Sequence, residues 1–87
     1  MTARAKYLAK VLLTRMATLE NAARKDAARR QELVAKVLLA EVGVSDFSLS
    51  NLVMVAMPDI VEGRATTTRE LDELARFLDQ HVAVLRD

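Results

Sequence analysis

The stretch that decides the fold runs from Thr2 to Val42 and reads TARAKYLAKVLLTRMATLENAARKDAARRQELVAKVLLAEV. It contains neither glycine nor proline, and most of its residues have a high intrinsic helix propensity. In its first half, apolar side chains recur at helical spacing along one stripe about 100° wide, which predicts an amphipathic helix. The members of the stripe are Ala5, Leu8, Ala9, Leu12, Met16 and Leu19.

The middle of this stretch is ambiguous, because between Glu20 and Glu32 the only apolar side chains are alanines. The helix either runs unbroken or mildly bent for about forty residues, roughly 60 Å, or bends near residues 21–26 to give two helices. We favour the first interpretation, since no helix-breaking residue is present. A compact domain of this length has a radius of gyration near ~12 Å, so such a rod would need a partner to cover its stripe.

The second half predicts a central helix that follows a turn. Gly43 is a plausible C-cap for the preceding helix, and Ser45 and Ser48 are N-cap candidates for the next one. The segment from Leu49 to Met57 is apolar nearly all round. We therefore expect it to be the buried centre of the fold.

A last amphipathic helix is predicted near the C-terminus. Residues 59–62 should form a short helical turn closed by Gly63, and Thr67 with Glu70 has the spacing of a capping box. The helix then extends over 68–85. Its apolar stripe consists of Leu71, Leu74, Leu78, Val82 and Leu85, with Ala75 and Phe77 beside it.

Composition bounds the fold class. The 87 residues make one small domain, 1–87, and the high alanine content with two Gly and one Pro indicates an all-α protein. It divides into a basic amphipathic part, 1–42, and an apolar and acidic helical part, 43–87. Because a chain this short buries only ~60% of its unfolded surface, we expect a homodimer. The absence of cysteine fits a reducing, cytoplasmic location. No stretch reaches the roughly 18 uncharged apolar residues of a membrane span.

Charge is divided unevenly along the chain. Residues 1–40 carry nine Lys or Arg against three acids, whereas residues 41–87 carry four against nine, so the halves are about +6 and −5. Such asymmetry indicates a basic surface for an anionic partner, or a basic element docked on an acidic one.

Catalytic chemistry has little support in the residue types. The chain holds one histidine, His81, no cysteine and no glycine-rich phosphate loop. Asp79 is its neighbour in sequence, but residues two apart on a helix point in different directions. We therefore expect no enzyme, no catalytic residue, no metal site and no cofactor.

The basic cluster, which we define as Arg24, Lys25, Arg29 and Arg30, is the stronger candidate site. These side chains spread round more than half of a helix whose small alanines would permit close approach to phosphates. The alternative is a solvated face balanced by Glu20, Asp26 and Glu32, for example through an Asp26–Arg30 pair. Neither interpretation is excluded by the pattern.

Residues 43–78 resemble the later part of a repressor-type helix-turn-helix domain. The matching pieces are Gly43-Val44-Ser45, Ser48-Leu49-Ser50-Asn51-Leu52, Glu62-Gly63-Arg64, and the Leu71, Leu74, Ala75, Leu78 spacing of the last helix. The resemblance implies that Ser48, Ser50 and Asn51 face DNA and that Arg64 approaches a phosphate. The chain departs from the family at residues 53–61, which make the implied recognition helix apolar, and the half that contains it is acidic.

Two functions remain open from the sequence. One is a small nucleic-acid-binding or transcription-regulatory protein whose basic helix contacts phosphates. The other is a non-enzymatic protein–protein interaction module, such as a helical adaptor, inhibitor or assembly subunit, in which the basic and acidic halves pair.

Overall fold

The N-terminal run does not form one rod but folds back on itself. A computed structural model describes residues 2–58, 60 and 65–86, and this part of the chain contains α-helices, one short 3₁₀ helix and no strand. The elements are α1 (Ala3–Ala17), α2 (Asn21–Lys25), α3 (Ala27–Val42), α4 (Phe47–Ala56), α5 (Thr68–His81) and the 3₁₀ helix η1 (Ala83–Arg86).

The favoured prediction of an unbroken N-terminal helix is therefore wrong, and the predicted bend near residues 21–26 is closer to the structure. α1 ends at Ala17, and its C-cap is Thr18, whose hydroxyl donates back to the carbonyl of Arg15 at 2.6 Å. Glu20 and Asp26 have extended backbones on either side of α2. Asp26 also caps α3, since its side chain accepts from the N–H groups of Ala28 and Arg29.

Burial explains why the chain breaks without a glycine or proline. A straight helix would hold the stripes of α1 and α3 at opposite ends of a rod, each facing solvent. The reversal through α2 instead buries Leu12 and Met16 of α1 in the same core as Val34 and Leu38 of α3. Apolar burial stabilises by about 25 cal/mol per Å². The free energy gained by burying these side chains therefore outweighs the small free energy by which an alanine-rich linker favours the helical state.

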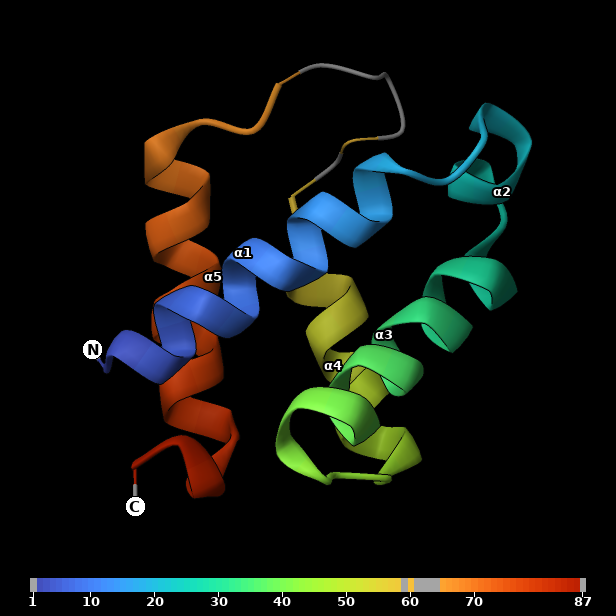
Figure 1. Cartoon of the computed structure of the whole chain (residues 1–87). Helices are drawn as coiled ribbons and strands as arrows, with labels where there is room; N and C mark the ends of the chain where they lie inside the picture. The colour runs from blue at the N-terminus through green and yellow to red at the C-terminus, as the bar shows by residue number, and fades with distance from the viewer. Residues whose placement is uncertain (1, 59, 61–64, 87) are drawn as a thin grey trace.

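The core lies where α1 crosses α5 and where α3 packs on α4 (Figure 1). The Cα radius of gyration is 11.9 Å, so the molecule is a compact helical domain. The predicted stripe of α1 is confirmed, because its five members within the helix are buried and Leu19 packs against the core. The last predicted helix ends at His81, earlier than expected. The chain nevertheless continues through η1 with Val82 and Leu85 buried.

The cap predictions can be compared residue by residue. Thr67 and Glu70 form the predicted capping box, and Gly43 caps α3 in the left-handed region. The N-cap of α4 is Asp46 rather than Ser45 or Ser48, because the Asp46 carboxylate accepts from the N–H of Leu49 at 3.2 Å. The predicted turn at residues 59–62, with Gly63, lies outside the described residues.

Replacing Gly43 with alanine tests the turn after α3. The backbone φ of Gly43 is +69°, but an added Cβ would meet no atom within 4 Å. The cost is therefore backbone strain alone, about 1 kcal/mol, and the melting temperature should fall by roughly 4–8 °C. Urea unfolding measures the loss. Gly43→Asn should lose less, since asparagine tolerates this conformation; an alanine variant as stable as the parent would contradict the assignment.

Candidate nucleic-acid interface

Helices α3 and α4 are joined by a short turn that changes the direction of the chain sharply. Four residues, 43–46, separate the helices, and the chain bends by 111° between them. Gly43 supplies the left-handed residue that the turn needs, and Asp46 caps the start of α4. Helices at about 90–120° joined by a turn of three or four residues are also the geometry found in helix-turn-helix units.

The exposed face of α4 differs from the prediction in two respects. Ser50 is 1% exposed, and its hydroxyl donates to the backbone carbonyl of Asp46 at 3.1 Å, so it does not face outward. Ser48 and Asn51 are exposed, as a base-contacting role requires. Only Ser50 and Val53 of this helix are buried, so α4 is not the buried centre that its apolar composition predicts.

The outward side of α4 is apolar. Phe47 is 73% exposed, Val55 71% and Leu52 43%. The helix FSLSNLVMVA carries no charge at all. In a domain of this size α4 packs along one side only, against α3 and α5, and the rest of its apolar surface stays in contact with solvent.

Arg24 of the basic cluster stabilises the junction between α1 and α2 rather than facing outward. Its Nη1 donates to the carbonyl of Ala17 at 3.2 Å, and its Nη2 donates to the side-chain oxygen of Asn21. Its Nε is buried and has no hydrogen-bond partner among the residues that the structure describes. The side chain of Arg24 is thus engaged with the chain itself, and its predicted phosphate contact stays a prediction.

Arg30 is also turned inward. The side chain is half-buried, and its Nη1 donates to the backbone carbonyl of Arg24 at 2.6 Å. The predicted Asp26–Arg30 ion pair does not form, since the Asp26 carboxylate accepts instead from the backbone at the start of α3. The arginine pair Arg24 and Arg30 thus connects α1, α2 and α3 through carbonyl groups.

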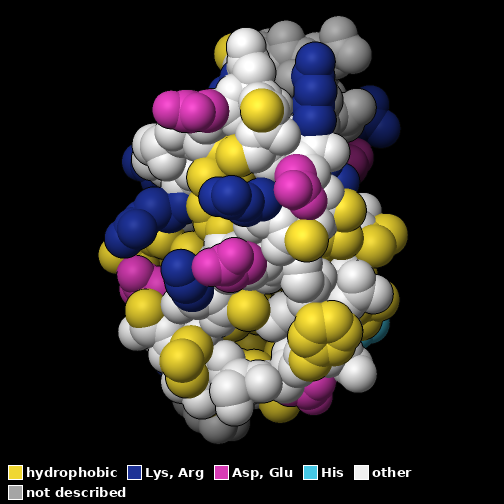
Figure 2. All heavy atoms as spheres, turned by 90° about the vertical axis from the view of Figure 1, so that its right-hand side faces the viewer, with side chains coloured by type: hydrophobic (Ala, Val, Ile, Leu, Met, Phe, Trp, Pro, Cys, Tyr) yellow, Lys and Arg dark blue, Asp and Glu magenta, His cyan; other side chains and the backbone are white. Residues whose placement is uncertain are grey.

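Lys25 and Arg29 remain exposed, and neither forms an ion pair within the described part of the chain. On the face that carries α2 and α3, Lys and Arg side chains lie in the upper and middle parts, intermixed with acids (Figure 2). The lower part of that face, toward the turn after α3, shows hydrophobic and acidic side chains and no Lys or Arg. The remaining predicted contact, Arg64, lies outside the described residues.

The fold brings Arg15 of α1 close to Arg29 of α3, which sequence reasoning missed. A hollow of ≈ 240 Å³ lies between the two helices, and its lining includes both arginines and Lys36. Lys36 forms an ion pair with Glu32 at 3.0 Å, and this hydrogen-bonded lysine lowers the pKa of the Glu32 carboxyl. The sequence indicates only that Arg15 is exposed, because the helical period places it outside the apolar stripe of α1. Its proximity to Arg29 results from the chain reversal.

Other kinds of site find no support among the described residues. No group of three or more His, Asp or Glu side chains in residues 2–58, 60 and 65–86 could hold a metal ion. In that part of the chain no single helix is long and apolar enough to cross a membrane. The bent pair of α3 and α4 passes the same length and composition test only when the two helices are taken together.

No protein-family model, no curated protein and no solved structure matches this chain.

Proposed function

We propose that this protein is a small regulatory protein that binds duplex DNA through the helix-turn-helix unit of α3 and α4. The observation that carries the proposal is the 111° bend across a four-residue turn, with the N-terminal part of α4 exposed. In such units the N-terminal residues of the second helix contact base edges, while the first helix crosses the phosphate backbone.

The exposed side chains fit these two roles. The Asn51 amide can pair with the N6 and N7 edge of adenine, the Ser48 hydroxyl with any base edge, and Phe47 with a thymine methyl group. Lys25, the last residue of α2, and Arg29, in the first turn of α3, supply the phosphate contacts. Arg24 and Arg30 are left out of the interface, because they hydrogen-bond to the chain's own carbonyls.

Fluorescence anisotropy with a labelled random duplex of about 20 base pairs tests the proposal. Affinity should fall roughly 10²-fold between 50 and 200 mM salt, as expected for about three or four phosphate contacts. Absence of binding at 50 mM salt, or binding that is insensitive to salt, would contradict it.

A second candidate function is favoured by the apolar outward side of α4. Exposed Phe47, Leu52 and Val55 on an uncharged helix are typical of a protein–protein contact, either with a second copy of this chain or with another protein. The same experiment separates the candidates when gel filtration with light scattering accompanies it. A contact between two copies of this chain gives a mass above one chain that persists at high salt, with no duplex binding.

A further inference from the structure

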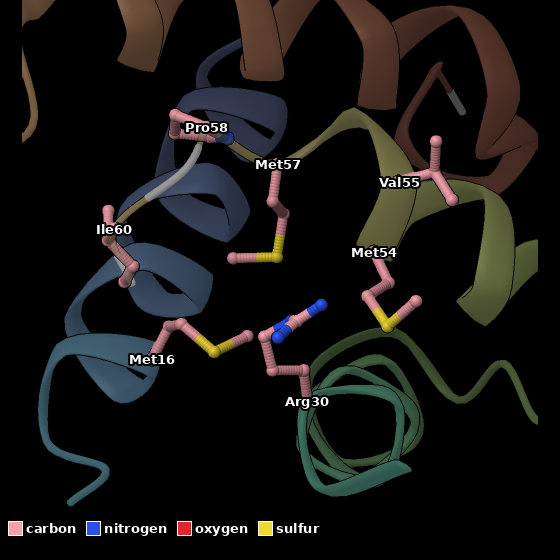
Figure 3. Close-up of a pocket in the computed structure, with 7 residues that line it drawn as sticks. All are labelled: Met16, Arg30, Met54, Val55, Met57, Pro58 and Ile60. Carbon is pink, nitrogen blue, oxygen red and sulfur yellow. The ribbon is translucent and has the colours of Figure 1, made fainter. Parts of the chain in front are cut away.

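A cavity between α1, α3 and α4 combines an arginine with methionine side chains. Its volume is ≈ 300 Å³, and Arg30 is the one charged residue among its described lining residues. Figure 3 shows the guanidinium of Arg30 in the middle of the cavity, with methionine side chains from α1 and from the α4 region around it. The other lining residues are Met16, Met54, Val55, Met57, Pro58 and Ile60.

The charge of Arg30 has no counter-ion in the described part of the chain. Its Nη1 donates a hydrogen bond to the uncharged carbonyl of Arg24. None of the ion pairs in residues 2–58, 60 and 65–86 includes it. The nearby Arg24 is a second cation that has no carboxylate partner among the described residues, and within them its buried Nε has no acceptor. A cation held beside apolar side chains costs free energy unless an anion pairs with it.

We infer that this cavity binds a small amphipathic carboxylate. The carboxylate would pair with the N–H groups of Arg30 that face the cavity, since a guanidinium and a carboxylate form short, charge-assisted hydrogen bonds. The apolar part of the ligand would pack against Met16, Met54 and Met57, whose flexible, polarizable side chains adapt to irregular ligands. The volume lies at the lower end of the range for small-molecule sites. The inference does not depend on the DNA-binding proposal.

The methionines supply a direct measurement. Three of the four methionines in the chain line the cavity, so methyl NMR of protein labelled with ¹³C-methyl methionine reports on it. We use octanoate as the probe, with 1-octanol as the same chain without the charge and acetate as the charge without the chain. Octanoate should shift the signals of Met16, Met54 and Met57 with an affinity at least ~10-fold above that of either control.

Two variants locate the charge that the ligand recognises. Arg30→Gln should weaken octanoate binding at least ~10-fold, the loss expected for a charge-assisted pair. Arg76→Gln, which removes the same charge from an exposed site on α5, should leave binding within about two-fold. Circular dichroism checks that each variant is folded. If Arg30→Gln does not fold, the comparison of octanoate, 1-octanol and acetate on the parent chain still tests the inference. Equal binding of octanol and octanoate, no methyl shifts, or octanoate affinity unchanged in folded Arg30→Gln would overturn the inference.

Discussion

The variant Leu12→Ala should lose about 3 kcal/mol of unfolding free energy, as buried leucines in helical proteins do when truncated to alanine. Leu12 is fully buried in α1, the helix that contacts both α5 and α3. A domain of 87 residues has a total stability of about 4–13 kcal/mol. The substitution therefore removes a large part of it, and the melting temperature should fall by roughly 12–24 °C.

Leu39→Ala is the matched control, because it makes the same chemical change at a site that is 56% exposed on α3. Its unfolding free energy should stay within about 0.5 kcal/mol of the parent value. Urea unfolding followed by circular dichroism measures both variants. A Leu12→Ala protein as stable as Leu39→Ala would show that α1 does not pack as described.

Local signals in the sequence were sufficient to predict several features. Gly43 and the Thr67–Glu70 pair mark helix ends whose hydrogen bonds close within a few residues, so no tertiary information is needed. The 3.6-residue period likewise identified the buried sides of α1 and α5. An all-α domain follows from these elements together.

The chain reversal at α2 could not be predicted in the same way. Neither Thr18 nor Glu20 is a helix breaker, and the break forms because folding back buries the stripes of α1 and α3 together. The exposure of α4 has the opposite origin. Its composition predicts a buried helix, but α3 and α5 cover only the side that carries Ser50 and Val53.

The candidate site shows the same limit. The sequence identifies four cations in the basic cluster, but it does not show where each side chain finds an acceptor. Arg24 and Arg30 donate to main-chain carbonyls that the reversal brings near them, whereas Lys25 and Arg29 do not. The identity of the cations was thus readable from the sequence, and their division into inward and outward pairs required the fold.

That division predicts a large effect of the double variant Lys25→Gln/Arg29→Gln on DNA binding. Each phosphate contact releases counterions from the DNA, and this release strengthens binding less as the salt concentration rises. Per contact, the affinity at 50 mM salt is about 15-fold higher than the affinity at 1 M salt. Loss of two contacts should therefore weaken duplex binding roughly 10²-fold at 50 mM. The slope of log affinity against log salt should also become shallower by about two. Anisotropy titrations at several salt concentrations measure both quantities.

The matched control is Arg76→Gln/Arg86→Gln, which removes the same net charge from exposed residues of α5 and η1. If phosphates are contacted by the outward pair, this control should lower affinity only slightly and keep the parent salt slope, because distant exposed charges are screened beyond about 10 Å at 0.1 M salt. Equal losses in the two double variants would mean that the overall charge, and not Lys25 and Arg29, attracts DNA. The helix-turn-helix proposal would then lose its phosphate contacts, and the apolar outward side of α4 would favour a protein partner instead.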